Sequence, residues 1–235
     1  LSGYYSNDRV SKVGYYAFTS CSELTSVNFP NCTSIGSYAF TNCSALTSVI
    51  FPNCTYINQF AFTNCSALTS VIFPNCTFIS YSAFANCSAL SSIDLPNCTS
   101  IGIGAFYNCY SLTSINLPNC IYVNDEAFYN CYSLTSINLP NCTSIGYSAF
   151  AYCSALSLIK IPFCMDISRG VFYSCSNLTQ VYLNSVTRVT SIYSNTFSNC
   201  PKLTSVYVPS SLVDAFKVAS YWSSMSRKIV AYTEG

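Results

Sequence analysis

A cysteine recurs every 11 residues from Cys21 to Cys175, fifteen times without interruption. The cysteines form two interleaved series, each with a period of 22 residues. The first series, mostly preceded by Pro-Asn, comprises Cys32, Cys54, Cys76, Cys98, Cys120, Cys142 and Cys164. The second comprises Cys21, Cys43, Cys65, Cys87, Cys109, Cys131, Cys153 and Cys175, and closes at Cys200 after a slip of three residues. A fixed period of about 20–50 residues is typical of a solenoid, a propeller or another repeat array.

The first half of each unit predicts a short β-strand. In residues 46–65, apolar side chains at Val49 and Phe51 have a period of two, and Pro52 ends the segment because proline cannot donate to a strand ladder. Equivalent strands are predicted to begin at nine leucines, namely Leu24, Leu46, Leu68, Leu90, Leu112, Leu134, Leu156, Leu178 and Leu203. Stacked in parallel at about 4.8 Å per rung, these strands would form a rod about 40 Å long.

The second half of each unit carries an Ala-Phe pair, as at Ala61 and Phe62, and its spacing favours short helical or 3₁₀ turns over a strand. The phenylalanine recurs at Phe18, Phe40, Phe62, Phe84, Phe106, Phe128, Phe150 and Phe172, and then at Phe197. We expect these rings to point inward and to form a stacked spine that dominates the core.

The repeat resembles those of a known family. The pattern Leu-x-x-Val-x-Phe-x-x-Cys-x-x-Ile resembles the leucine-rich repeats, and Pro-Asn-Cys-Thr-Ser-Ile-Gly-x-x-Ala-Phe-x-Asn-Cys-x-x-Leu is similar to the BspA-like subfamily of bacterial cell-surface proteins. The resemblance covers about residues 10–209. It implies a leucine-rich-repeat solenoid of the α/β horseshoe class, mostly β, with a parallel sheet of about nine short strands. It also implies a secreted or cell-surface adhesion protein without catalytic residues, and similar arrays occur in phage and gut-bacterial proteins.

Three segments are predicted. Residues 1–23 would be an N-terminal cap or a truncated repeat, because residues 1–9 fit the strand pattern poorly, and residues 24–209 form the array. Residues 210–235 would be a C-terminal cap, since Ser210 at an N-cap position opens an amphipathic helix that ends near Trp222, and residues 228–232 read as a final strand. The chain begins with Leu1 and has no signal peptide, so we interpret it as a matured form, a fragment or a trimmed piece of a longer protein.

Charge is scarce and segregated. Charged residues make up 7% of the chain, against about 25% in an average protein. Residues 13–159 contain four acids and no Lys or Arg, whereas residues 160–235 contain seven basic and three acidic residues. The basic end either keeps the terminal repeats soluble or docks an acidic partner. Scattered basic groups argue against nucleic-acid binding, and no apolar run approaches the ~20 residues that span a bilayer.

Sixteen cysteines suggest three uses. They could form a disulfide framework, bind metal or fill the core as buried thiols. Cβ atoms on neighbouring rungs would lie about 4.8 Å apart, beyond the disulfide range of about 3.5–4.5 Å, and no CxxC motif or histidine is present, so buried thiols are the favoured interpretation. Asparagines preceding the cysteines form two further columns, which we expect to cap backbone groups of the turns. Several read as glycosylation sequons, a match that follows from the repeat itself.

Catalysis is not indicated. The absence of histidine excludes Ser-His and Cys-His nucleophile pairs, and no glycine-rich phosphate loop is present. The adjacent acids Asp125 and Glu126 read as a solvated turn more readily than as an acid–base dyad. We therefore predict a non-enzyme with no cofactor and no metal site.

Variable residues between the fixed core positions are the candidate ligand-binding surface. The outward position of the strands contributes Ile50, Ile72, Asp94, Lys160, Tyr182 and Tyr207, and a row after the phenylalanine, which also includes Tyr173, contributes Tyr107 and Tyr129. A further variable row lies on the turns before Ala-Phe and reads Tyr15-Tyr16, Ser37-Tyr38, Gln59-Phe60, Tyr81-Ser82, Ile103-Gly104, Asp125-Glu126, Tyr147-Ser148 and Arg169-Gly170. Neutral drift of exposed positions is the alternative interpretation. Surfaces rich in Tyr, Ser and Asn suit contact with protein or glycan. The first hypothesis is thus a secreted or cell-surface module that recognises a host or neighbouring-cell protein or glycan. The second is a structural spacer or tip of a larger surface or phage fibre, with self-association through the N-terminal end.

Overall fold

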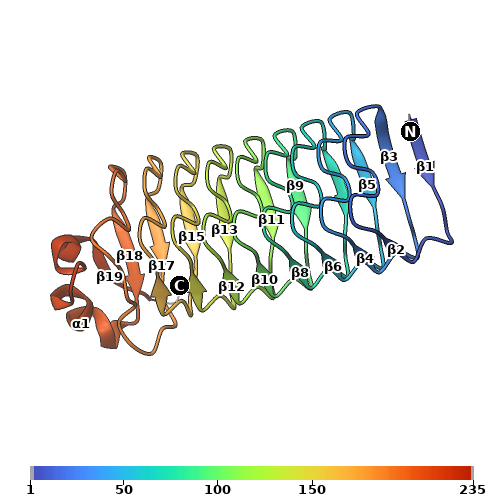
Figure 1. The fold of residues 1–235 in the computed structure, drawn as a ribbon. Coiled ribbons are helices and arrows are strands. Elements are labelled where there is room, and N and C mark those ends of the chain that lie inside the picture. Colours follow the sequence, from blue (N-terminus) through green and yellow to red (C-terminus); the bar gives the residue numbers. More distant parts are fainter. Residues whose placement is uncertain (1–2, 234–235) are drawn as a thin grey trace.

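The computed structural model describes residues 3–233, which form a single elongated parallel β-solenoid (Figure 1). The coils contribute short strands to two columns, and within residues 3–233 those from residue 180 onward contribute to the first column alone. The first column is β1 (Gly3–Ser6), β3 (Leu24–Asn28), β5 (Ser48–Ile50), β7 (Ser70–Ile72), β9 (Ser92–Asp94), β11 (Ser114–Asn116), β13 (Ser136–Asn138), β15 (Leu158–Lys160), β17 (Gln180–Tyr182), β18 (Ser205–Val208) and β19 (Ile229–Ala231). The second is β2 (Lys12–Val13), β4 (Ser34–Ile35), β6 (Tyr56–Ile57), β8 (Phe78–Ile79), β10 (Ser100–Ile101), β12 (Tyr122–Val123), β14 (Ser144–Ile145) and β16 (Asp166–Ile167).

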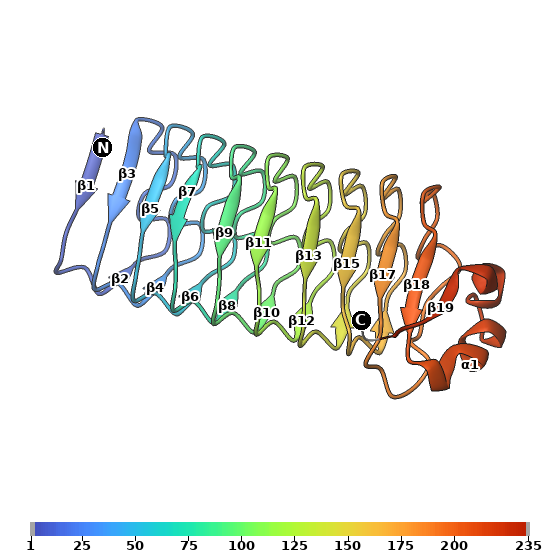
Figure 2. The same cartoon turned by 180° about the vertical axis from the view of Figure 1, so that it is seen from behind.

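The first column, seen along the rod in Figure 2, confirms the nine predicted strands, which correspond to β3 through β18 in this column. Residues pair 22 apart through most of the array, as Val49 does with Val27 and Val71. This register is fixed because a slip of one residue would turn the buried valines to solvent. Two strands extend the column: β19 is the predicted final strand, whereas β1 forms from residues that fitted the strand pattern poorly and pairs with β3.

The second half of the coil differs in part from the expected helical turns. Its first residues form the two-residue strands β2 to β16, which make one continuous eight-stranded sheet. The Ala-Phe segment that follows lies between two residues with positive φ, for example Phe60 (φ 59°) and Asn64 (φ 62°). Within it, the Phe62 N–H donates to the Ala83 carbonyl of the next coil at 2.7 Å. The turns are therefore held partly by ladders between coils and partly by bonds of the expected 3₁₀ type within the coil, in which the Thr63 N–H donates to the Phe60 carbonyl and the Cys65 N–H to the Phe62 carbonyl.

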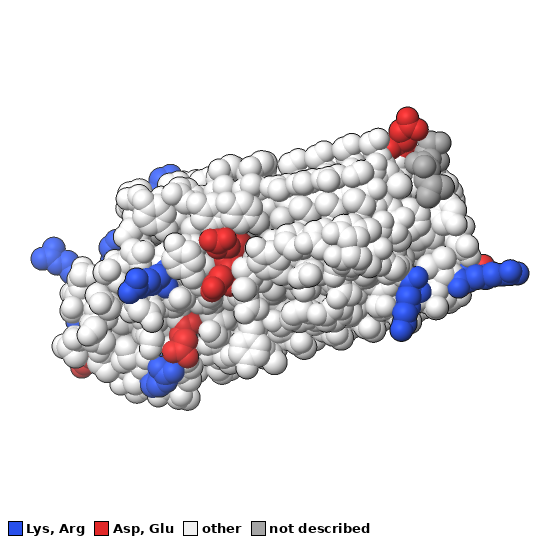
Figure 3. All heavy atoms as spheres, viewed as in Figure 1, with Lys and Arg blue, Asp and Glu red and all other residues white. Residues whose placement is uncertain are grey.

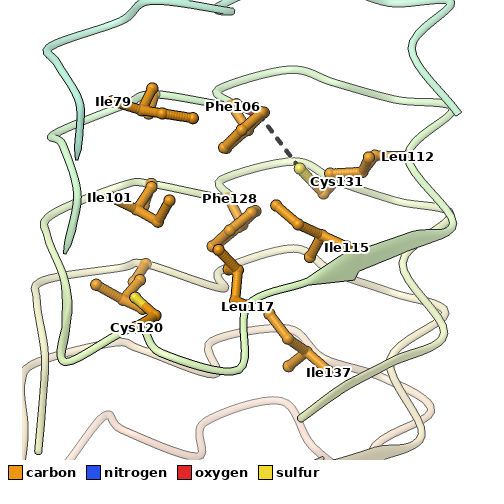
Figure 4. Close-up of a cluster of buried hydrophobic side chains, with 14 of the residues drawn as sticks. Ile79, Ile101, Phe106, Leu112, Ile115, Leu117, Cys120, Phe128, Cys131 and Ile137 are labelled. Carbon is orange, nitrogen blue, oxygen red and sulfur yellow. Dashed lines mark hydrogen bonds between the residues drawn. The ribbon is translucent and has the colours of Figure 1, made fainter. Parts of the chain in front are cut away.

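The core is a stack of identical layers, and it confirms the predicted phenylalanine spine (Figure 4). Phe106 is fully buried, and its ring is parallel to those of Phe84 and Phe128 at centroid distances of 5.4 and 5.3 Å. The cysteines fill the space beside this spine as free thiols, fifteen of them buried and Cys21 partly exposed. In the second series the thiol donates to a phenylalanine carbonyl, as Cys131 does to Phe106 at 3.3 Å.

The first cysteine series bonds within its own coil, where the thiol donates to the carbonyl two residues on, as Cys120 does to Tyr122 at 3.4 Å. Burial raises the pKa of most of these thiols, to about 12 for Cys54 and about 11 for Cys98, whereas a hydrogen bond with Cys164 lowers the pKa of Cys142. A desolvated thiol that donates to a carbonyl stays protonated and unreactive at neutral pH.

The two asparagine columns tie neighbouring coils together. In the first, the side-chain amide donates to a proline carbonyl of the preceding coil, as Asn97 does to Pro74 at 2.9 Å. In the second, the amides form a side-chain ladder in which Asn108 donates to Asn86 at 2.9 Å. The expected role as caps of turn backbone is thus correct for the first column and wrong for the second. Asparagine suits this second column because it tolerates the left-handed conformation (φ 60° at Asn108).

A cap closes the C-terminal end. It consists of η1 (Ser210–Leu212), α1 (Val213–Val218) and η2 (Ser223–Lys228), followed by β19. The predicted long helix with Ser210 as N-cap is wrong: Ser210 lies in a 3₁₀ turn, and α1 spans six residues without a side-chain cap. Trp222 seals the end instead, because its ring lies 5.9 Å from that of Phe197 and its Nε1 donates to the Thr190 carbonyl at 2.7 Å.

Candidate ligand-binding surfaces

The long sides of the rod carry very little charge. The view in Figure 3 shows basic side chains at both ends and acidic ones in a few places, with an uncharged expanse between them. The one ion pair in residues 3–233 joins Arg188 and Asp166 at 3.4 Å, with both side chains more than half exposed. Such a pair contributes little to stability. Contacts along this surface must therefore come from apolar area and neutral hydrogen bonds.

Six of the eight predicted ligand-binding residues lie in a single row on the first strand column, which we call the strand row. Their register partners run through Ile50 and Ile72, then Asp94, and later Lys160, Tyr182 and Tyr207. Ile72 is 44% exposed and Ile50 is half-buried. The row therefore changes in character along the rod, from an apolar end to an aromatic and basic end.

The aromatic end of the strand row is tightly organised. The rings of Tyr182 and Tyr207 stack at 4.5 Å, and Lys160 Nζ lies 5.8 Å above the Tyr182 ring. In the middle of the row, Asn116 Nδ2 donates to Asp94 Oδ1 at 2.7 Å, so this carboxylate already has a protein partner. The pKa of Tyr182 is raised by partial burial and by Tyr207, so its hydroxyl remains a hydrogen-bond donor at neutral pH.

The other two predicted residues, Tyr107 and Tyr129, lie on the turns. Their rings stack face to face at 4.9 Å with an interplanar angle of 2°. The facing surfaces of these rings are therefore covered, and they offer edges and hydroxyl groups to a ligand. Partial burial and the neighbouring Tyr152 raise the pKa of Tyr129 to about 12.

A second aromatic strip was not identified as a unit from the sequence. It comprises Tyr15, Tyr16, Tyr38, Phe60 and Tyr81. The three central rings stack at 4.7–4.9 Å, whereas Tyr15 and Tyr81 at the two ends are T-shaped to their neighbours. The signal was present, because these residues occupy the two variable positions before Ala-Phe, Tyr15 and Tyr81 at the first and Tyr16, Tyr38 and Phe60 at the second. Ring orientation, however, is not encoded in the spacing.

A small cleft, which we call the tyrosine cleft, was not predicted as a site from the sequence. It encloses about 200 Å³ and is lined by Tyr129, Tyr147, Ser148, Ala151, Tyr152, Gly170, Tyr173 and Asn195. Of these, Tyr129 was among the predicted ligand-binding residues, and Tyr147, Ser148, Gly170 and Tyr173 lie in the variable rows before and after the phenylalanine. The available signal was Tyr152, which stands where four consecutive earlier repeats, from Asn64 to Asn130, carry asparagine.

Of the adjacent acids Asp125 and Glu126, Asp125 is hydrogen-bonded to the next coil. Asp125 Oδ1 accepts a hydrogen bond from the Tyr147 backbone N–H at 2.7 Å, which fixes the turn of the next coil. Residues 3–233 contain no group of three or more acidic, cysteine or histidine side chains placed to hold a metal ion. In the same residues, no helix is long and apolar enough to cross a membrane.

Comparison with known proteins places these features in a family. The family described as BspA type Leucine rich repeat region matches residues 4–109 and 99–225. Among solved structures, a leucine-rich-repeat protein of T. pallidum has a TM-score of 0.60 and 28% identity, covering 65% of this chain and 77% of that chain. The pneumococcal vaccine antigen PcpA has a TM-score of 0.51 and 17% identity, covering 95% of this chain and 71% of that chain, which shows a similar fold.

A leucine-rich cell surface protein of Faecalibacterium prausnitzii A2-165 is 24% identical, with a TM-score of 0.48, over 93% of this chain and 86% of that chain. Among curated proteins, no relative matches. Because the family match covers nearly the whole array, the chain belongs to the BspA-type leucine-rich-repeat family.

Proposed function

We propose that this chain is a non-enzymatic recognition module, displayed at a cell surface or secreted, that binds a protein or a glycan. The family is typical of bacterial surface proteins, which supports this location. The observation that carries the proposal is that each repeat combines fixed core positions with variable surface positions. Core positions are nearly invariant from coil to coil, whereas the aromatic strip, the strand row and the tyrosine cleft vary and remain accessible.

The chemistry of these surfaces suits adhesion. Tyrosine presents a large, rigid and amphipathic contact at low entropic cost, and the serines and asparagines around it supply hydrogen bonds. Because residues 13–159 carry only four charged side chains, binding along this stretch should depend little on salt. Ile72, exposed on the strand row, adds an apolar anchor for a protein partner.

Two parallel experiments test this function. The purified chain is applied to a glycan array and, separately, used as bait for proteins solubilised from the surfaces of candidate host and neighbouring cells, each at low and high salt. We expect saturable binding in one of the two that survives high salt. Binding that disappears as salt is raised would point to the basic C-terminal end instead. Absence of binding in both would contradict a recognition role.

One observation favours a second function, a spacer or tip within a larger fibre. β1 is the end strand of its sheet, and within residues 3–233 its outward edge has no strand partner. Such an edge can pair with a strand from an upstream segment or from a second copy. Light scattering over a range of concentrations tests the second copy: a mass that grows with concentration supports assembly, and a constant monomer mass contradicts it.

A further inference from the structure

The tyrosine cleft is built by the turns of four consecutive coils. Tyr129 comes from the first coil, Tyr147 and Tyr152 from the second, Tyr173 from the third and Asn195 from the fourth. The ring of Tyr152 is T-shaped to both Tyr129 and Tyr173, at 5.3 and 5.4 Å. Crossed rings leave a hollow between coils, whereas the stacked pairs elsewhere on the rod fill the space between theirs.

The repeat departs from its own pattern at this cleft in one place. Tyr152 interrupts the asparagine ladder and adopts φ 63°, a left-handed conformation that costs a tyrosine about 1–2 kcal/mol. Gly170 follows one coil later with φ 62°, at a variable position that is Ser148 in the preceding coil and also glycine at Gly104. A Cβ at Gly170 would lie 3.2 Å from Ser148 Oγ and 3.7 Å from Asn195 Nδ2. Glycine therefore keeps the floor of the cleft open.

Two polar groups converge on this open floor. Within residues 3–233, neither the Ser148 hydroxyl nor the Asn195 side-chain amide has a hydrogen-bond partner in the protein, and both residues line the cleft, where solvent or a ligand can reach them. Tyr147 stands at the rim, 47% exposed, and its ring packs against no other aromatic ring of the described chain. Its backbone is held by Asp125 at 2.7 Å, so the ring is presented from a fixed turn.

The size and polarity of the cleft define the ligand. A volume of about 200 Å³ holds roughly seven water molecules at about 30 Å³ each, which is the space of one sugar ring. Aromatic walls with a few placed polar groups are typical of small-molecule sites. No Lys, Arg, Asp or Glu lines the cleft. The lining therefore offers no charge to pair with an anionic ligand, which favours a neutral one.

We propose that this cleft binds a neutral hexopyranose unit, with an apolar face of the sugar on the Tyr147 ring and its hydroxyls hydrogen-bonded to Ser148 and Asn195. This inference rests on the proposed recognition function and narrows it to a glycan. A single ring makes few contacts, so we expect a Kd on the order of 1 mM for a monosaccharide. Tighter binding by a surface-displayed glycan would arise from several copies engaging at once.

The test uses saturation-transfer NMR and titration with the methyl glycosides of glucose, galactose, mannose and N-acetylglucosamine, with glucuronic acid as the anionic probe. Gly170→Ala should weaken binding of the neutral glycoside at least tenfold by filling the floor. Its matched control is Gly104→Ala, because Gly104 has φ 59°, its Cβ would also meet a serine hydroxyl at 3.2 Å, and it also precedes a tyrosine by three residues. Tyr147→Ala should likewise weaken binding at least tenfold, and circular dichroism verifies that each variant folds.

The outcomes separate this inference from the proposed function. Weakened binding in Gly170→Ala and Tyr147→Ala, with Gly104→Ala unchanged and glucuronic acid bound more weakly, supports the cleft. Equal effects of the two glycine variants overturn it. Glycan-array binding by the unaltered chain that survives Tyr147→Ala, or partner capture with no glycan binding, overturns the cleft and leaves the recognition function standing. Failure of both the array and the partner capture overturns both.

Discussion

Burial of the cysteine thiols makes the free energy of unfolding depend steeply on pH above neutrality. Fourteen cysteines have a raised pKa in the folded chain, and burial is the largest cause for all of them except Cys164, where a hydrogen bond with Cys142 comes first. The pKa is about 12 for Cys43 and about 11 for Cys200. In the unfolded chain the thiol pKa returns to about 8.5.

The sign follows from these two values. Because folding favours the protonated thiol, the resulting stabilisation is fully present below the unfolded pKa of about 8.5 and is lost as the pH rises from there towards the folded pKa. At pH 9, half a unit above the pKa in the unfolded chain, the contribution of each thiol to the free energy of unfolding has fallen by about 1 kcal/mol. Together the buried thiols lose on the order of 10 kcal/mol, which is comparable to the free energy of unfolding of an ordinary domain, about 5–15 kcal/mol.

Urea unfolding followed by far-ultraviolet circular dichroism at about pH 7.5, 8.5 and 9.5 measures this loss. We expect the urea midpoint to fall sharply between the last two conditions, and thiolate absorbance to rise together with the loss of structure. Tyrosine and lysine remain mostly protonated in this range, so the slope reports on the thiols. The slope of the free energy of unfolding against pH gives the number of protons released on unfolding. Cys98→Ala should reduce this number by up to one, whatever its own effect on stability. A midpoint at pH 9.5 close to that at pH 7.5 would refute the reasoning.

Three further predictions follow from the packing. Thiol titration of freshly prepared, unreduced protein should count sixteen thiols under denaturing conditions and only Cys21 reacting rapidly in the native state, whereas a denatured count well below sixteen would reveal disulfides. Phe106→Ala should lower the free energy of unfolding by about 3–5 kcal/mol, and Phe18→Ala by less because that ring is partly exposed; equal losses in urea titrations would contradict the stacked core. Asn108→Ala should lower the free energy of unfolding by about 1–3 kcal/mol. The loss for Asn108→Gly should be about 1 kcal/mol smaller, because glycine adopts φ 60° freely. Thermal denaturation of the two variants measures this difference.

The coil itself was predictable because the same pattern of apolar and turn residues recurs in every repeat. Val49 and Phe51 alternate, Pro52 stops the strand and Phe62 recurs one coil on, so inward positions followed from period and polarity alone. The two-residue strands were missed, since Tyr56 and Ile57 are too few to show an alternation. β1 was missed because only its pairing with β3 gives the segment its conformation.

The candidate sites were predictable as positions and not as shapes. The spacing placed Ile50, Ile72 and their equivalents in one row, and the structure brings them together there. It could not tell that Tyr107 and Tyr129 would cover each other's faces, or that Tyr152 would cross its neighbours. Ring orientation depends on the coils above and below, which lie 22 residues away in the sequence.

The sequence by itself determined the period, the inward side chains and the reading of the cysteines as core residues, because a solenoid repeats one local rule and each coil must bury the same face. Tertiary structure alone decided where the surface is covered and where it is open. The tyrosine cleft exists because four coils meet there, with a tyrosine in place of the ladder asparagine and a glycine at a position that varies from coil to coil. Each change is small within its own repeat, and only their stacking in space makes a site.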